Sequence, residues 1–70
     1  MPGEGSFVVE GVVIDALPNG TWRIELSNGH RLLGFVTGKA KPNFTARPGD
    51  RLRLQVSPYD LSEGRILVNY

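Results

Sequence analysis

Two Asn-Gly pairs, at positions 19–20 and 28–29, enclose a short segment in which apolar and polar residues alternate. Glycine adopts a positive φ without steric cost and asparagine tolerates one, so each pair is typical of a tight hairpin turn. Between the two turns, Trp22, Ile24 and Leu26 fall on one face of an extended chain. The sequence therefore predicts a strand bounded by two hairpins, at the centre of an antiparallel meander.

The same two-residue period recurs along the chain and predicts further strands. The expected strands are residues 7–17, 21–27, 30–36, 51–56 and 65–69. The segment 57–64 (SPYDLSEG) is expected to be a loop before the last strand. Residues 37–50 are poor in aliphatic side chains and contain two prolines and two glycines. They are expected to form a long loop or a short helical turn between strands three and four.

The first expected strand contains a conflict in its alternation. Glu10 and Asp15 have opposite parity, so a regular strand could not expose both carboxylates. A β-bulge at Gly11 would shift the alternation by one residue. A bulged first strand and a long connection between strands three and four are typical of an OB-fold, an all-β barrel of five strands. A five-stranded SH3-like barrel is the alternative, and the continuous meander of the first three strands favours the OB-fold.

Length and composition exclude several classes of protein. Seventy residues suit one small domain, residues 1–70, of which 1–6 are expected to be a flexible N-terminus. With no cysteine and one histidine, His30, neither a disulfide nor a metal site is predicted, and no cofactor is expected. No apolar run approaches the ~18 residues that span a bilayer, and the N-terminus lacks a secretory pattern. We therefore expect a cytoplasmic monomer that does not bind membranes.

Catalysis is not predicted from the residue pattern. The sequence contains no phosphate-binding G-x-x-x-x-G-K-[ST] loop and no cysteine nucleophile, and no Ser, His and Asp that local spacing would bring together. Asp60 and Glu63 are close in sequence, but two loop acids are more typical of a turn. The chain is therefore expected to bind a partner without an enzymatic reaction.

Charge is distributed unevenly along the chain, although the formal net charge is only +1. Residues 1–30 contain one arginine and four acids, whereas residues 31–70 contain seven lysines or arginines and three acids. Such asymmetry is compatible with a surface that binds a polyanion and also with an ordinary solvated surface.

Nucleic-acid binding is the function that the residue pattern favours. OB-fold barrels bind single strands across strands two and three and their flanking loops. On this chain that face would carry Arg23, Arg31, Leu33 and Phe35. The ring of Phe35 either stacks on a base or covers the base of a loop. The segment 38–47 combines cations, an amide and an aromatic ring, which suit phosphates, base edges and stacking. Its candidate residues are Lys39, Lys41, Asn43, Phe44 and Arg47.

Two motifs in register resemble a known family. "LPNGTWRIELSNGHRLLGFVTGK" and "GDRLRLQVSPYDLSEGRI" are similar to bacterial translation initiation factor 1, over residues 8–68. The resemblance implies a five-stranded OB-fold that binds the small ribosomal subunit at the decoding (A) site. It also implies contacts with ribosomal RNA, with adjacent ribosomal proteins and with the other initiation factors, and no catalysis. By position, Lys39 matches the lysine of a G-K pair and Arg65 the arginine of G-R-I.

The central loop departs from the pattern of that family. It is one residue shorter, Lys41 stands for an arginine and Pro42 for a lysine, and the chain stops at "VNY" without further basic residues. Lysine lacks the planar fork that binds RNA in a bidentate manner, so weaker binding is expected. Two alternatives remain: a single-strand-binding RNA chaperone of the cold-shock type, and an OB scaffold that binds a protein through Leu33 and Phe35.

Overall fold

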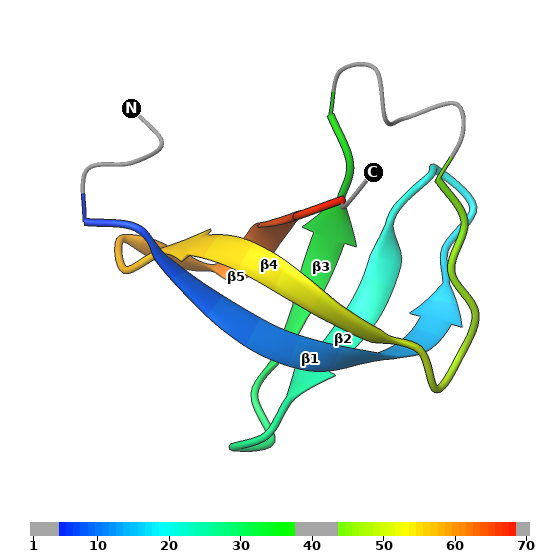
Figure 1. The fold of residues 1–70 in the computed structure, drawn as a ribbon, viewed down its shortest axis with the longest axis horizontal. Helices are drawn as coiled ribbons and strands as arrows, with labels where there is room; N and C mark the ends of the chain where they lie inside the picture. Colours follow the sequence, from blue (N-terminus) through cyan, green and yellow to red (C-terminus); the bar gives the residue numbers. More distant parts are fainter. Residues whose placement is uncertain (1–4, 38–43, 69–70) are drawn as a thin grey trace.

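A closed barrel of antiparallel and parallel strands forms the body of the protein (Figure 1). The computed structural model describes residues 5–37 and 44–68, and the order of strands around the barrel is β1-β2-β3-β5-β4. No helix occurs in these residues, and none therefore is long and apolar enough to cross a membrane. The strands are β1 (Phe7–Ala16), β2 (Trp22–Leu26), β3 (Arg31–Phe35), β4 (Arg51–Ser57) and β5 (Asp60–Ile66).

Closure of the barrel depends on one parallel contact. All other neighbouring strands pair antiparallel, whereas β3 and β5 run in the same direction and pair through Leu33↔Glu63, Gly34↔Gly64 and Phe35↔Arg65. Parallel strands need a long crossover, which the connection after β3 together with β4 provides. The predicted all-β OB-fold of five strands is confirmed.

The core lies inside the barrel and follows the predicted alternation. The inward faces of β2, β3 and β4 each supply buried aliphatic residues, while Arg23, Arg31 and Arg53 of the same strands are exposed. Trp22, on the same predicted face as Ile24, packs against this core from a half-buried position. The buried core residues are Val13, Ile24, Leu32, Val36, Leu54, Val56 and Ile66.

The two Asn-Gly turns form as predicted, and in both the glycine carries the positive φ. Gly20 has φ 79° and Gly29 has φ 87°. The first turn is closed by a 2.9 Å hydrogen bond from the backbone N–H of Leu17 to the carbonyl of Thr21. In the second, the N–H of His30 donates to Oδ1 of Asn28 over 3.0 Å.

The predicted bulge exists, but its predicted position at Gly11 is wrong. Gly11 pairs regularly with both neighbouring strands, and the register shift against β2 falls between Val13 and Asp15. The last regular pair between β1 and β4 is Val12 with Arg51. The next residue of β1, Val13, instead forms backbone hydrogen bonds with Gly49 and Asp50, in the turn that precedes β4. The strand therefore bends where its two partners diverge. Gly11 is required for packing instead, because a Cβ there would lie 2.5 Å from Cγ2 of Ile24.

The predicted loop 57–64 is also wrong, because β5 begins at Asp60. Only Pro58 and Tyr59 form the turn between β4 and β5, and Asp60 pairs directly with Ser57. The first residues of β5 are all exposed, so they show no apolar alternation from which a strand could be predicted. Gly64, the last residue of the predicted loop, is instead buried inside the strand, where it packs over Val56.

Candidate nucleic-acid interface

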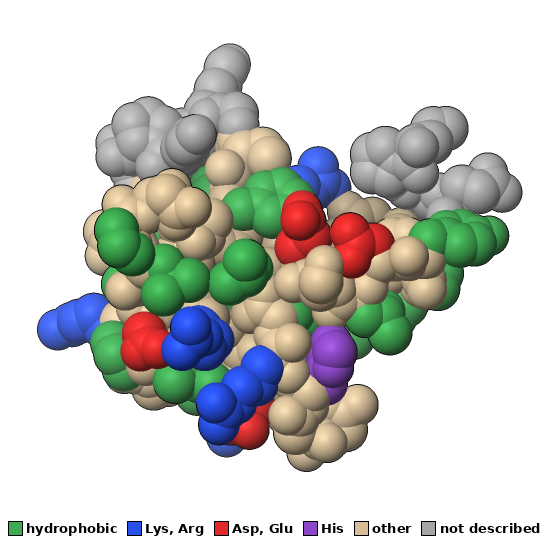
Figure 2. Space-filling view, turned by 180° about the vertical axis from the view of Figure 1, so that it is seen from behind, with side chains coloured by type: hydrophobic (Ala, Val, Ile, Leu, Met, Phe, Trp, Pro, Cys, Tyr) green, Lys and Arg blue, Asp and Glu red, His purple; other side chains and the backbone are tan. Residues whose placement is uncertain are grey.

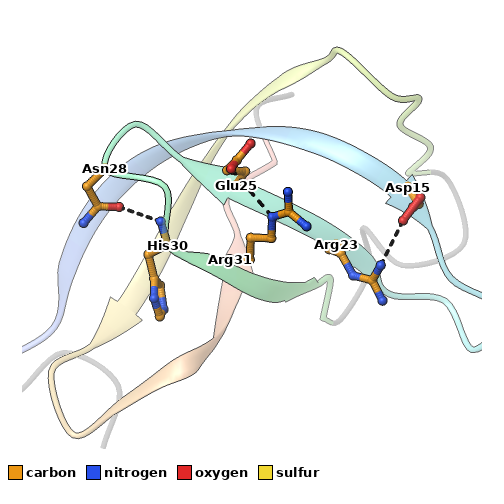
Figure 3. Close-up of polar contacts among 6 residues, drawn as sticks. All are labelled: Asp15, Arg23, Glu25, Asn28, His30 and Arg31. Atoms are coloured by element: carbon orange, nitrogen blue, oxygen red, sulfur yellow. Dashed lines mark hydrogen bonds and ion pairs between the residues drawn. The ribbon is translucent and has the colours of Figure 1, made fainter.

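Two predicted contact residues, Arg23 and Arg31, project from the same side of the β2–β3 sheet (Figure 3). Both are exposed, and each lies beside a carboxylate. Nη1 of Arg23 is 3.2 Å from Oδ2 of Asp15, and Nε of Arg31 is 3.6 Å from Oε2 of Glu25. Surface ion pairs of this kind contribute little stability, about 0–1 kcal/mol. Their main consequence is that a neighbouring carboxylate already offsets part of the positive charge of each arginine.

Strand register explains both ion pairs. Arg31 lies opposite Glu25 in the β2–β3 ladder, and Arg23 lies opposite Asp15 in the β1–β2 ladder. The second pairing depends on the bulge after Val13, which turns Asp15 to the outer face. The sequence predicted the two arginines on this face, but their partners belong to neighbouring strands and required the register.

Arg65 lies in a different setting, in a hollow of about 360 Å³ formed by β3, β4 and β5. Its Nη2 donates a hydrogen bond to Oε1 of Gln55, and Nε2 of Gln55 donates to Oγ of Ser6 over 2.9 Å. Arg65 and Gln55 are both half-buried. A neutral amide therefore orients Arg65, and no carboxylate among the described residues forms an ion pair with it.

Phe35 forms another part of the same hollow and is half-buried. It is the direct partner of Arg65 in the parallel β3–β5 ladder, so closure of the barrel brings these two predicted residues together. An aromatic ring and a guanidinium are suited to stacking on bases and to binding phosphates. Asp60 and Glu63 also line the hollow, so acidic and basic groups share it.

Gln55 is a residue that the sequence analysis did not single out. It occupies an outward position of β4 and pairs with Arg65 across the β4–β5 ladder. The alternation of RLRLQV did predict that its side chain faces outward. Its role could not be predicted, because the strand beside β4 at this level was unknown, and β5 had been expected to begin only at Arg65.

Phe44, a predicted stacking residue, packs inward at the base of the central loop. Its ring meets Trp22 edge to face, with 5.1 Å between ring centroids and an interplanar angle of 89°. Both residues are half-buried and contact the core. Aromatic pairs of this kind contribute about 0.5–1.5 kcal/mol beyond the area that they bury. Phe44 is therefore an anchor for the chain that follows the central loop.

The other candidates of the central loop divide into two groups. Lys39, Lys41 and Asn43 lie outside the described residues. Arg47 is exposed, and its backbone forms a closed turn with Asp50. The N–H of Arg47 donates to Oδ2 of Asp50 over 2.9 Å, and the N–H of Asp50 donates to the carbonyl of Arg47 over 3.0 Å. This turn fixes the backbone of Arg47 and leaves its guanidinium at the surface.

A patch of exposed apolar residues beside His30 was not predicted as a unit. Tyr59 is 88% exposed, Leu61 45% and Leu33 41%, and all three line a groove with His30. His30 is exposed and forms one contact with a neighbouring strand. Nε2–H of the imidazole donates to the backbone carbonyl of Leu61 over 2.7 Å, which ties the β2–β3 hairpin to β5.

Basic and acidic side chains are mixed over the face made by β2, β3 and β5 (Figure 2). One of its acids, Asp60, has a pKa below its ordinary value, because the hydroxyl and the backbone N–H of Ser62 both donate hydrogen bonds to its carboxylate. It therefore stays ionised down to a lower pH than a free carboxyl. Of the arginines on these three strands, Arg23 and Arg31 form ion pairs among the described residues and Arg65 does not.

Comparison with known proteins identifies a similar structure. No family model matches the chain. The solution structure of translation initiation factor 1 from the Wolbachia endosymbiont strain TRS of Brugia malayi superimposes with a TM-score of 0.74 and 33% sequence identity. The match covers 96% of this chain and 80% of that chain. It therefore includes the barrel and both faces described above.

Proposed function

This chain belongs to the translation initiation factor 1 family, and we propose that it binds the small ribosomal subunit at the decoding site through ribosomal RNA. The observation that carries this proposal is the 33% identity over 96% of the chain, together with the structural similarity at a TM-score of 0.74. Composition alone would not suffice, because a net charge of +1 is compatible with many partners.

Arg65 is the residue best prepared for a phosphate. Its guanidinium is oriented by Gln55, so less side-chain entropy is lost on binding than for a free arginine. It forms no ion pair with an acid in the described part of the chain, although Asp60 and Glu63 line the same hollow. Phe35, in the same hollow, supplies an apolar surface for a base or a ribose.

The remaining candidates act around this point. Arg47, Lys39 and Lys41 add cations from the central loop, and Asn43 adds an amide that can reach base edges or sugar hydroxyls. Phe44 supports the end of that loop through its contact with Trp22.

Arg23 and Arg31 are weaker contacts in this proposal, because each must leave or share its carboxylate partner to bind a phosphate. Adjacent ribosomal proteins and the other initiation factors complete the proposed set of partners. No chemical step is part of the proposed role.

Equilibrium binding to purified small subunits across a salt series tests this proposal, with naked single-stranded RNA as the control. We expect tight binding to the subunit that weakens steeply with salt, because each neutralised phosphate changes the log–log slope by roughly −0.7 to −0.9. We also expect the bound protein to protect decoding-site bases from chemical probes. Equal affinity for any single strand, or protection elsewhere on the subunit, would refute decoding-site binding.

A further inference from the structure

The outward face of β4 carries two arginines that the proposed decoding-site contact does not use. Arg51 and Arg53 occupy alternate outward positions and are exposed. The next outward residue is Gln55, which holds the guanidinium of Arg65 from β5. We call Arg51, Arg53 and Arg65 the β4 row. Arg51 and Arg53 are two residues apart on one strand and are therefore separated by roughly 6.6 Å. Arg65 lies on the neighbouring strand, at the level of the next outward position, because it pairs with Gln55.

The strand on the other side of β4 gives this row only one opposing carboxylate. Across the β1–β4 ladder, Val12 lies opposite Arg51, Glu10 opposite Arg53 and Val8 opposite Gln55. Val12 and Val8 are exposed apolar residues, 39% and 55% accessible. The β1 neighbours therefore add apolar surface at two of three positions.

Acids lie near the row, but none of the described acids forms an ion pair with it. Glu10 and Glu25 line a hollow together with Arg51. The ion pairs among the described residues are nevertheless formed by Arg23 and Arg31, and none by Arg51, Arg53 or Arg65. The row therefore differs from the β2–β3 face, where both arginines already have carboxylate partners.

From this arrangement we propose that the β4 row binds the sugar–phosphate backbone of single-stranded RNA, as a second contact surface that continues from Arg65. Guanidinium groups bind phosphates in a bidentate manner, and three of them at successive levels of neighbouring strands suit a polymer that carries one phosphate per nucleotide. The apolar side chains of β1 would lie beside the sugars and bases of that strand. The inference rests on the proposed function in one respect: it assumes that the RNA bound by the β4 row is the same strand that contacts Arg65.

Binding of single-stranded oligouridylate tests the β4 row directly. Oligonucleotides of about 4 and about 16 nucleotides bracket the site sizes known for OB-folds. If the row is a track, the long oligonucleotide binds with the steeper salt dependence. Arg53→Gln then lowers that log–log slope by roughly 0.7, and Arg51→Gln with Arg53→Gln lowers it by about twice as much. The short oligonucleotide should respond to Arg65→Gln and much less to Arg53→Gln.

Three control variants separate a track from general electrostatics. Arg53→Lys keeps the charge and should retain the slope while losing part of the affinity. Asn19→Asp changes the net charge by the same amount as Arg53→Gln, but at the β1–β2 turn, where its Oδ1 can still accept the hydrogen bond from Thr21. Glu10→Gln removes the one acid opposite the row and should tighten binding of the long oligonucleotide.

The outcomes distinguish failure of the row from failure of the proposed function. Equal effects of Arg53→Gln and Asn19→Asp, or an unchanged slope in the double variant, would overturn the β4 row. If the slope depends on Arg53 while the protein does not bind small subunits, the row stands and the decoding-site proposal fails. If the protein binds small subunits and Arg53→Gln changes the binding of neither oligonucleotide, the decoding-site proposal stands and the β4 row fails. Thermal unfolding of each variant checks that the barrel is intact.

Discussion

The β2–β3 face and the β4–β5 side of this barrel present arginines in two different electrostatic states. On the first, Arg23 and Arg31 are exposed and form ion pairs with acids of the neighbouring strands. On the second, Arg65 is half-buried and held by the neutral side chain of Gln55. Exposure alone would rank the arginines of the β2–β3 face above Arg65 as anion contacts. The ion pairs among the described residues reverse that order, because they involve Arg23 and Arg31 and not Arg65.

This difference follows from strand pairing rather than from composition. An arginine that faces an acid across a ladder gains a little stability and loses part of its attraction for a ligand. An arginine that faces an amide keeps its full charge and gains orientation. The order of strands therefore decides which cations are available, and the five predictions below change that pairing or its partners.

The largest effect is expected from Gly34→Val, which would disturb the barrel on which both arginine settings depend. A Cβ at this position collides with Cδ1 of Ile24 and approaches Cδ1 of Ile66 to 3.1 Å. Either the buried side chains of Ile24 and Ile66 would have to shift, or the parallel β3–β5 contact that aligns Phe35 with Arg65 would have to move. We expect a loss of about 1–3 kcal/mol of unfolding free energy, measured by chemical denaturation.

Leu33→Ala is the matched control for that variant, because Leu33 is the preceding residue of β3 and is exposed. It should lower the unfolding free energy by less than about 1 kcal/mol. In a domain of this size each kcal/mol corresponds to a shift of roughly 4–8 °C in Tm. Similar melting temperatures for Gly34→Val and the parent protein would show that the barrel can relax around a side chain there.

A second prediction compares the two arginine states directly. Arg65→Ala should weaken binding to small subunits by roughly tenfold, since a charge-assisted hydrogen bond contributes about 1.5–3 kcal/mol. Arg23→Ala should weaken it by only about two- to threefold, because Asp15 already shares that charge. A titration of both variants at one ionic strength decides the matter, and the opposite ranking would remove the basis of the comparison.

Gln55→Glu would give Arg65 a carboxylate neighbour, so that the β4–β5 side would resemble the β2–β3 face. A carboxylate at this position would pair with Arg65, as Asp15 does with Arg23. We expect binding to small subunits to fall several-fold and the salt dependence to become shallower by about one unit. Stability should change little.

Gln55→Leu gives the complementary control for Gln55→Glu. It removes the hydrogen bonds to Arg65 and Ser6 without adding a charge. The salt slope should therefore be retained while the affinity falls, because the charge of Arg65 remains and its orientation is lost. If both variants give the same slope, Gln55 acts only through packing.

The fold could be predicted from the sequence wherever apolar residues alternate. The faces of β2, β3 and β4 follow from this pattern, and the turns at 18–20 and 28–29 follow from glycine chemistry. The pattern failed where a strand is exposed on both sides, as in the first half of β5. It also failed for the bulge, whose place is set by the divergence of β2 and β4 around Val13 and not by the glycine nearby.

The candidate site was less predictable than the fold, because its properties depend on contacts between strands. Residue type and parity sufficed to put Arg23, Arg31 and Phe35 on the outer surface. They could not show that acids oppose the two arginines, or that Gln55 orients Arg65. The contributions of Lys39, Lys41 and Asn43 remain predictions, since these residues lie outside the described part of the chain.

Asp15→Asn should leave Arg23 beside a neutral amide, as Arg65 is beside Gln55. An amide can still accept a hydrogen bond from Nη1 of Arg23, but it does not share the charge. We expect binding to small subunits to improve by roughly twofold and the unfolding free energy to change by no more than about 1 kcal/mol. Isothermal titration at low and high salt would test this, because the gain should disappear at high salt. Weaker binding would mean that Asp15 is needed to position Arg23.

The smallest expected effect comes from Asp60, which lines both the Arg65 hollow and the groove beside Arg23 and Arg31. Hydrogen bonds from Ser62 hold its pKa below the ordinary value, so folding favours the ionised carboxylate. That small stabilisation is present above the pKa of the unfolded chain and is lost as the pH falls through the lower pKa of the folded state. Asp60→Asn should therefore lower Tm slightly near neutral pH and not at all in strong acid, which melting curves from acid to neutral pH would measure.

The same variant tests the comparison itself, because Asp60 faces both regions. Removing its charge should raise the affinity for anions without changing the ranking of Arg65 above Arg23. Repeating the Arg65→Ala and Arg23→Ala titrations in the Asp60→Asn background measures this. A reversed ranking in that background would show that Asp60, and not strand pairing, sets the difference between the two regions.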